Sequence, residues 1–284
     1  MTMKKLLTLA LAMLMVLSLA ACGSSGTTTP SSNAANSGTS SEEGVNTTDI
    51  TTVEPGKLIL ATNCQFPPYE MVADGEGFNG TGFEGIDVEI ASAIADKLGL
   101  ELQIDDMDFD SSLLAVQEGR SDILLAGLSY SEERDEVMDF TTKYATGVQV
   151  VIVKDGSGVT MDNLGDYMIG TQRGTTGFIY ASDTPENGGY GEDHVIGYDS
   201  GVTAVQELIN GTIDAVIIDN EPAKAYVESN PGLKILDTSY AEEDYAIGMN
   251  KSNTALLEAV NAALEELKAD GTLQSIVDKY IKAE

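Results

Sequence analysis

The sequence is poor in the residues that support metal and thiol chemistry. It has no tryptophan, two cysteines and a single histidine, His194, among 284 residues. One histidine excludes a His-rich metal centre and makes any Ser/His/Asp or Cys/His catalyst depend on that one side chain. Two cysteines exclude a disulfide scaffold. We therefore expect no metal and no cofactor, and most hydrolase classes are disfavoured.

Basic residues are also scarce. The chain has 15 Lys and Arg against 46 Asp and Glu, which gives a formal net charge of −31. Nucleic-acid binding depends on neutralising phosphates with Lys and Arg, so no nucleic-acid partner is expected. The hydrophobic share of 42% is enough for a sizeable core. The length allows two compact units, or one large unit, together with a tail.

Residues 1–21 are predicted to be a signal peptide. Two lysines at 4 and 5 precede an apolar run over 6–21, broken only by Thr8 and Ser18, and Cys22 follows. This run is short of the ~20 residues that span a bilayer. The residues around Cys22 resemble the bacterial lipobox, which implies lipidation of Cys22 and an anchor in the membrane. An ordinary secretory signal with a chance cysteine is the alternative.

Residues 22–56 are predicted to form a lipidated cysteine and a disordered tether. Positions 23–48 contain almost no large apolar side chains, so burial cannot offset the entropy of ordering them. Removing the signal peptide takes away two lysines and no acids, which lowers the net charge from −31 to −33. Cys64 is then the only unmodified thiol, and stability must come from packing rather than from an internal disulfide.

From Lys57 onward, short β-branched runs alternate with helical patterns, which is typical of an α/β fold with mostly parallel sheets. There are enough elements for two sheets. Strands are predicted over 58–62, 101–104, 122–126, 148–153, 168–171, 194–196, 214–218 and 245–249. Helices are predicted over 87–98, 112–118, 177–181, 202–209, 222–228 and 254–269.

Two segments that follow predicted strands have groups suited to a carboxylate. Arg134 follows the strand 122–126, and Gly174 to Gly177 follow the strand 168–171 and open a helix. Open α/β sheets place ligands at the carboxyl ends of strands, and a helix N-terminus and an Arg fork both favour an anion. Each segment has a simpler interpretation: a surface salt bridge for Arg134, and an ordinary turn for the Gly-Thr-Thr run.

Three further residues could complete a ligand site. Asp219 ends the apolar run 215–218 and is placed to bind a cation, although it could instead cap the following helix. Phe66 and Phe109 could stack on a ligand, although aromatic residues more often anchor a core or a loop.

Taken in order, these motifs resemble the extracellular solute-binding lipoproteins of polar amino-acid ABC importers. The resemblance covers about residues 57–282, and it is specific because several motifs occur together at the right spacing. It rests on Gln65-Phe66-Pro67-Pro68-Tyr69-Glu70-Met71, Gly82 to Asp87, Gly127 to Arg134 with Met138-Asp139-Phe140, Arg173-Gly174-Thr175-Thr176, and Ile218-Asp219.

The resemblance implies a two-lobe periplasmic-binding-protein clamshell. Each lobe is then a mostly parallel sheet flanked by helices, with two crossovers between lobes. Lobe 1 would comprise 57–145 and 245–284, and lobe 2 would comprise 146–244. Such a protein is a monomer outside the cytoplasmic membrane, at the cell surface or in the periplasm. It binds a free amino acid and delivers it to an ABC transporter permease.

The same resemblance implies roles for individual residues. Arg134, with Ser129 and Thr176, would bind the ligand α-carboxylate, and Asp219 the α-ammonium. Phe66 and Phe109 would sandwich the side chain. The full set of implied ligand-binding residues is Asn63, Phe66, Phe109, Gly127, Ser129, Arg134, Gln172, Gly174, Thr176 and Asp219.

Selectivity is expected to depend on Asn63. Binders of basic amino acids in the resembling family have Asp at the matching position, whereas this chain has a neutral amide. Gln172 and Ile218 are expected to face the same space. These residues favour a neutral polar or small apolar amino acid over Lys or Arg.

An enzyme on the same scaffold is the main alternative, because cyclohexadienyl or arogenate-type dehydratases resemble this family. Such chemistry needs an acid or base in the cleft. Glu70, Glu84 and Asp110 are candidates by proximity in sequence only. A binding protein rather than an enzyme is therefore expected.

Overall fold

The computed structural model describes residues 50–237 and 239–282, and all of them belong to one compact unit of the chain. The predicted signal peptide, Cys22 and residues 23–49 of the predicted tether lie outside the described residues. Among the described helices, none has both the length and the apolar character needed to cross a membrane.

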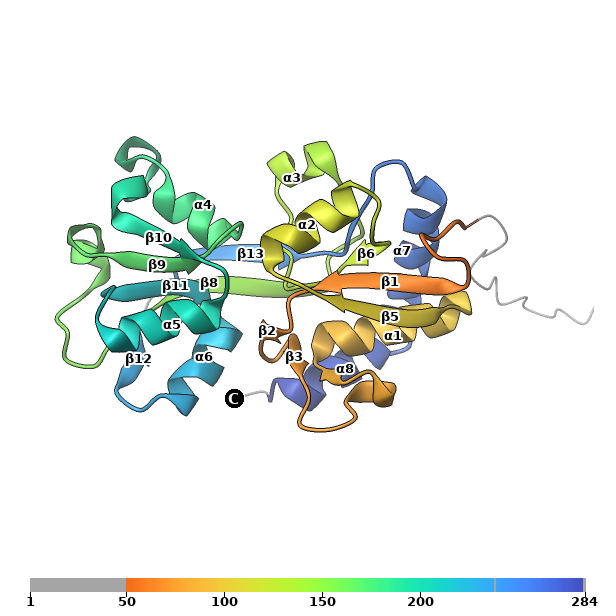
Figure 1. Ribbon diagram of the computed structural model, residues 1–284, viewed down its shortest axis with the longest axis horizontal. Coiled ribbons are helices and arrows are strands. Elements are labelled where there is room, and N and C mark those ends of the chain that lie inside the picture. The colour runs from red at the N-terminus through yellow and green to blue at the C-terminus, as the bar shows by residue number, and fades with distance from the viewer. Residues whose placement is uncertain (1–49, 238, 283–284) are drawn as a thin grey trace, which may run out of the picture. The chain divides into compact units, whose positions relative to one another are not determined.

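The first sheet has five strands and helices on both faces (Figure 1). Helix α2 covers one face, and α1 covers the other together with α7 and α8, while the short α3 leads into β7. The strand order is β5 (Glu101–Asp106), β1 (Lys57–Thr62), β6 (Ile123–Leu124), β14 (Gly248–Met249), β7 (Asp139–Phe140). The helices are α1 (Ile86–Leu98), α2 (Phe109–Gln117), α3 (Glu132–Val137), α7 (Thr254–Ala269) and α8 (Thr272–Tyr280).

The second sheet has six strands, with α4 on one face and α5 and α6 on the other. The strand order is β10 (Val195–Tyr198), β9 (Ile169–Gln172), β11 (Ala215–Asp219), β8 (Ala145–Lys154), β12 (Leu233–Ile235), and β13 (Ala241–Tyr245) also pairs with β8. The helices are α4 (Thr176–Ser182), α5 (Gly201–Asn210) and α6 (Asn220–Ser229).

The remaining elements are short. A three-stranded sheet forms part of the first lobe, and four short 3-10 helices lie in loops of the described residues. The strands are β2 (Gln65–Phe66), β3 (Glu70–Val72) and β4 (Phe83–Glu84). The 3-10 helices are η1 (Phe78–Gly80), η2 (Met161–Asp166), η3 (Pro185–Asn187) and η4 (Glu192–His194).

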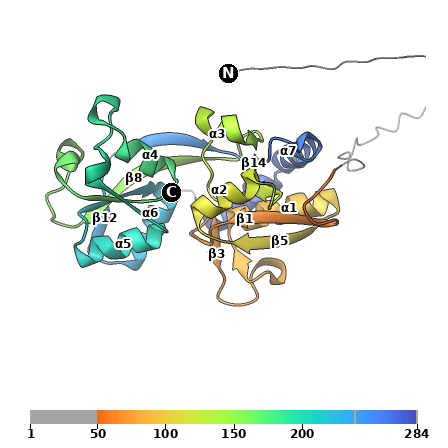
Figure 2. The ribbon, with the colours of Figure 1, turned by 45° about the horizontal axis from the view of Figure 1, so that its top comes forward.

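Strands β8 and β13 connect the two lobes. They pair antiparallel, from Ala241 opposite Gln149 to Tyr245 opposite Ala145, and run side by side between the lobes (Figures 1 and 2). The predicted two-lobe α/β fold is confirmed. The predicted mostly parallel sheets are wrong, because both sheets are mixed. β8 enters the second lobe antiparallel to β11 and β12, and the returning chain adds β14 antiparallel to β6 and β7.

Local sequence explains where the long helices begin and end. The Asn253 side chain accepts a hydrogen bond from Leu256 N and caps α7, whose apolar positions at helical spacing are buried in the core. Gly271 has φ 82 and allows the chain to turn from α7 into α8. No element is predicted after residue 269, so α8 is a finding of the structure. The predicted strand over 245–249 is two elements, the end of β13 and β14.

Candidate ligand-binding site

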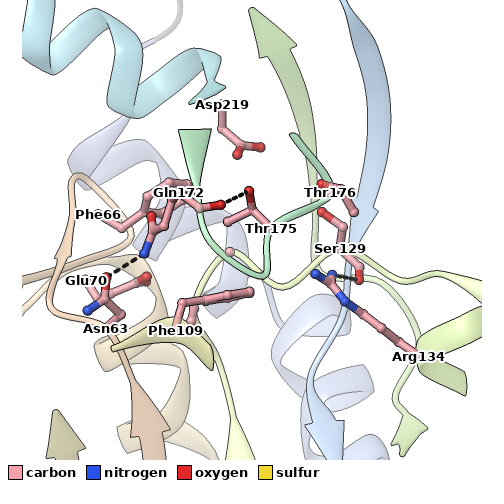
Figure 3. Close-up of a pocket in the computed structure, with 12 residues that line it drawn as sticks. Asn63, Phe66, Glu70, Phe109, Ser129, Arg134, Gln172, Thr175, Thr176 and Asp219 are labelled. Atoms are coloured by element: carbon pink, nitrogen blue, oxygen red, sulfur yellow. Dashed lines mark hydrogen bonds between the residues drawn. The ribbon is translucent and has the colours of Figure 1, made fainter. Parts of the chain in front are cut away.

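A cavity with about 320 Å³ of space, part of it open to solvent, lies between the two lobes. Elements of the first lobe supply Asn63, Phe66 and Arg134, and elements of the second supply Gln172 and Asp219 (Figure 3). The cavity is lined by Asn63, Phe66, Glu70, Phe109, Ala126, Gly127, Ser129, Arg134, Gln172, Thr175, Thr176 and Asp219. Nine of the ten residues expected from the sequence are among them, and Gly174 is not. Glu70, Ala126 and Thr175 were not expected.

Arg134 is held in place by backbone carbonyl groups. It lies in α3, where the Ser131 side chain accepts from Arg134 N and caps the helix. Its guanidinium donates from Nη1 to Ser129 O at 2.6 Å and from Nη2 to Gly174 O at 2.9 Å. The residue is only 8% exposed, so the surface salt-bridge interpretation is wrong. Burial lowers the pKa of Arg134, and nearby carboxylates, Glu243 first, oppose that shift.

Phe109 and Gly174 support this arginine. Cζ of Arg134 lies 5.7 Å from the centroid of the Phe109 ring, which is a cation–π contact. Gly174 has φ +76, and a Cβ there would lie 1.8 Å from Asp110 Oδ1. Glycine is therefore required at this position, where it contributes a carbonyl acceptor to Arg134 but does not line the cavity.

A glutamate that the sequence analysis missed engages the predicted carboxylate-binding hydroxyls. Glu243 Oε2 accepts hydrogen bonds from Ser129 Oγ at 2.9 Å, Thr176 Oγ1 at 2.8 Å and Gln149 Nε2 at 3.2 Å. Glu243 Oε1 is buried without a partner among the described residues. In sequence, Glu243 stands in an acidic run that resembles an exposed loop, so no local signal marked it.

Asp219 presents a buried carboxylate to the cavity. It ends β11 and occupies the N-cap position of α6, but its side chain makes no capping hydrogen bond. Instead, Oδ2 accepts from Gln149 Nε2 at 2.8 Å and Oδ1 accepts from the Tyr245 hydroxyl. Burial raises the pKa of Asp219 to about 7, although these two hydrogen bonds favour its charged form. A bound cation would favour ionisation of this carboxyl group.

The position of the Phe66 ring in the cavity wall depends on Gly127. Phe66 stacks on Tyr69 with ring centroids 5.8 Å apart. Gly127 has φ +53, and a Cβ at this position would lie 2.6 Å from Phe66 Cε1. Gly127 N donates to Asp87 Oδ2 at 2.9 Å. The glycine therefore lets the Phe66 ring approach the backbone closely.

Side-chain amides from the two lobes form a hydrogen bond to each other at the cavity wall. Gln172 Nε2 donates to Asn63 Oδ1 at 3.0 Å (Figure 3). Asn63 Nδ2 in turn donates to Met107 O at 2.8 Å. Both residues line the cavity as expected. The expectation for Ile218 is wrong. It does not line the cavity, and its Cδ1 packs against Gly201 at the start of α5.

Glu70 is the most unusual of the unexpected lining residues. It is fully buried, and no N–H or O–H group of the described residues donates to either carboxylate oxygen. Burial first, and the nearby charge of Asp87 second, raise the pKa of its carboxyl group. From the sequence, Glu70 is expected only as a candidate acid, although it follows Phe66 by four positions in the same motif.

Comparison with known proteins identifies the family. The profile of bacterial extracellular solute-binding proteins, family 3, matches residues 58–283. The chain belongs to this family. The arginine-binding extracellular protein ArtP of Bacillus subtilis (strain 168) is 32% identical over 99% of this chain and 100% of its own. The glutamine-binding protein GlnH of the same organism is 28% identical over 99% of this chain and 98% of its own.

A solved structure agrees with this assignment. The arginine-, lysine-, histidine-binding protein ArtJ from Geobacillus stearothermophilus superposes with a TM-score of 0.72 at 29% identity, covering 80% of this chain and 96% of that protein. The predicted family and the binding-protein fold are both confirmed.

Proposed function

We propose that the cavity binds one free amino acid, with its α-carboxylate at Arg134 and its α-ammonium at Asp219. Membership of the family makes the protein an extracytoplasmic solute-binding protein of an amino-acid ABC importer. The observation that carries the site assignment is the pair of opposite charges on the cavity wall. Arg134 and Asp219 are both buried, and hydrogen bonds hold each side chain in place. The two residues do not form an ion pair with each other. A zwitterion supplies both missing charges at once.

The remaining lining residues fit the rest of the ligand. Phe66 and Phe109 would flank the side chain, and Asn63 and Gln172 would face its distal part, with Gly127 and Gly174 shaping the site. Ser129 and Thr176 would add hydroxyl donors to the carboxylate. For Gly174, the proposed contribution is its carbonyl acceptor to Arg134.

We also propose the division of the chain and the way the cleft works. Lobe 1 comprises 57–145 and 245–284, lobe 2 comprises 146–244, and β8 and β13 form the hinge. A ligand that contacts both lobes favours the closed state by its differential affinity for that state. The closed, loaded monomer then docks on the permease. Lipidation at Cys22, followed by the tether, would hold it near the membrane.

The test is a thermal-unfolding screen of the purified protein against each of the twenty amino acids. A ligand present at 100 times its dissociation constant stabilises the native state by about 2.7 kcal/mol, which gives a clear rise in the melting temperature. Titration calorimetry then measures the affinity of each stabilising amino acid. The proposal fails if no amino acid raises the melting temperature.

The dehydratase alternative keeps one observation in its favour. Glu70 is the only one of the three candidate acids that lines the cavity, since Glu84 and Asp110 do not. The relatives found are binding proteins of transporters, which favours binding without turnover. Incubation with arogenate and prephenate, followed by chromatography, checks this alternative, and product formation would establish it.

A further inference from the structure

Two side chains on the strands that connect the lobes donate to the carboxylate of Asp219. Gln149 on β8 donates from Nε2 to Asp219 Oδ2 at 2.8 Å, and Tyr245 on β13 donates its hydroxyl to Oδ1. The same Gln149 nitrogen also donates to Glu243 Oε2 at 3.2 Å. Gln149 is 1% exposed and does not line the cavity, whereas Asp219 does. Gln149 therefore acts on a ligand only through other residues.

The register of the strands brings these groups together. Asp219 on β11 is paired with Gln149 on β8, and Gly147, two residues before Gln149, is paired with Glu243 on β13. Alternate residues of a strand point to the same face, so Gly147 and Gln149 share one face of β8. Gly147 leaves room there for Tyr245, since a Cβ at Gly147 would lie 2.3 Å from the Tyr245 hydroxyl oxygen. The connecting strands thus place one amide between two buried carboxyl groups.

Gln149 links the two ends of the proposed ligand site. Asp219 is assigned to the α-ammonium, and Glu243 holds the hydroxyls of Ser129 and Thr176 that are assigned to the α-carboxylate (Figure 3). This step rests on the proposed function, because both assignments come from it. An amide donates to a carboxylate without neutralising it, whereas a lysine or arginine at this position would form an ion pair. The negative charge of Asp219 therefore remains available to the ligand.

We propose that Gln149 is a positioning residue for the ligand ammonium: its amide orients the Asp219 carboxylate and stabilises its negative charge. Without this donor, Asp219 Oδ2 would be buried near the carboxylate of Glu243. A buried carboxyl group that lacks donors and lies near a second carboxylate favours its protonated form. A neutral carboxyl group binds an ammonium more weakly than a carboxylate does. The loss of affinity should therefore be largest at the pH values where Asp219 is protonated.

The groups around Asp219 make its protonation sensitive to Gln149. Burial raises the pKa of Asp219 to about 7. The hydrogen bonds from Tyr245 and Gln149 oppose this shift, and the charge of Glu243 adds to it. The ionisable groups around Asp219 are Glu243 and Tyr245 on β13, Tyr69 and Glu70 of the first lobe, Arg134 on α3, and Glu221 and Lys224 on α6, which pair with each other.

The experiment is titration calorimetry of the unmodified protein and of Gln149→Met at pH 6, 7 and 9. Methionine is unbranched like glutamine and donates no hydrogen bond. The probe is the one of the twenty amino acids that raises the melting temperature of the unmodified protein most. We expect Gln149→Met to bind it about tenfold more weakly, or worse, at pH 6 and 7. At pH 9, where Asp219 is mostly ionised in both proteins, the affinities should agree within about threefold.

A second readout measures the proton itself. Each titration at pH 7 is repeated in a buffer of different ionisation enthalpy, which gives the number of protons released on binding. Gln149→Met should release more protons than the unmodified protein, since more of its Asp219 must lose a proton when the ammonium binds. Gln103→Met is the matched control: Gln103 also donates from Nε2 to a carboxylate, that of Asp105, but outside the cavity lining. It should change neither the affinity nor the proton release.

If Gln149→Met does not fold, NMR spectroscopy of the unmodified protein tests the same contact. The side-chain amide signal of Gln149 should shift with pH around 7 in the ligand-free protein, because it follows the ionisation of Asp219. It should stay constant over the same range when the amino acid is bound. A signal that does not shift in the ligand-free protein overturns the proposal.

Two results with the variant also overturn it: a change in affinity of the same size at every pH, including no change, or equal proton release by the two proteins. Either result leaves the proposed function intact, because the unmodified protein still binds an amino acid. If none of the twenty amino acids binds the unmodified protein, both proposals fail.

Discussion

The hydroxyl of Ser129 donates to Glu243 Oε2 at 2.9 Å and links the loop after β6 to strand β13. Thr176 of the second lobe donates to the same oxygen at 2.8 Å. One internal carboxylate therefore holds a hydroxyl from each lobe. These are the hydroxyls that we assign to the ligand carboxylate, so the internal and ligand carboxylates compete for them.

Glu243→Gln should raise the affinity for the amino acid about tenfold, equivalent to about 1.4 kcal/mol. The substitution removes a negative charge near the bound carboxylate while keeping a side chain of similar shape. Titration calorimetry of both proteins measures the effect, with Glu242→Gln on the same strand as control. A lower affinity in Glu243→Gln would show instead that Glu243 orients the hydroxyls for the ligand.

Arg134→Ala should weaken amino-acid binding by a hundredfold or more, about 3 kcal/mol. The ligand carboxylate would lose both charge-assisted hydrogen bonds, and the N-terminus of the short helix α4 cannot replace them. Arg173→Ala is the control, because Arg173 is half exposed and pairs with Asp199 outside the cavity lining. Equal affinities for Arg134→Ala and the unmodified protein would remove Arg134 from the site.

The stability of the ligand-free protein should fall as pH rises from 5 to 7. The pKa of Asp219 is about 7 in the folded protein against 3.8 for the free group, so the native state binds more protons over this interval. The stabilisation by protonated Asp219 is complete at low pH and is lost as pH rises through 7. Asp219 alone accounts for a loss of about 2 kcal/mol between pH 5 and pH 7.

Urea unfolding at pH 5, 6, 7 and 8 measures this dependence, and Asp219→Asn should show a shallower decline. Asp87, whose pKa burial raises to about 6, contributes in the same direction in both proteins. Repulsion among the other acidic residues also affects stability, and it is the same in both proteins. Parallel stability curves for the two proteins would contradict the assignment to Asp219.

Cys22→Ala should release the protein from the membrane without changing amino-acid affinity. The reason is the lipobox-like sequence around Cys22 and the polar segment that separates it from the folded body. Cell fractionation with an antibody against the folded body measures the distribution. A variant that remains in the membrane fraction would refute lipid anchoring through this cysteine.

The sequence by itself determined the α/β class, the two-lobe family and most of the cavity lining. These features depend on local patterns: β-branched runs, helical spacing of apolar residues, and polar residues directly after a strand. Arg134 and Asp219 were predictable for this reason, because the end of a strand or the start of a helix places them at the edge of a sheet.

Only the tertiary structure decided the burial of Glu70 and Glu243 and the mixed order of the sheets. Glutamate is usually exposed to solvent, and the burial of these two glutamates depends on partners far along the chain. Glu243 meets Ser129 114 positions away, and Glu70 meets Asp87 on a different element. The antiparallel strands likewise arise where the chain returns from one lobe to the other. Such contacts leave no local pattern, because the energy of a buried charge depends on which groups surround it in space.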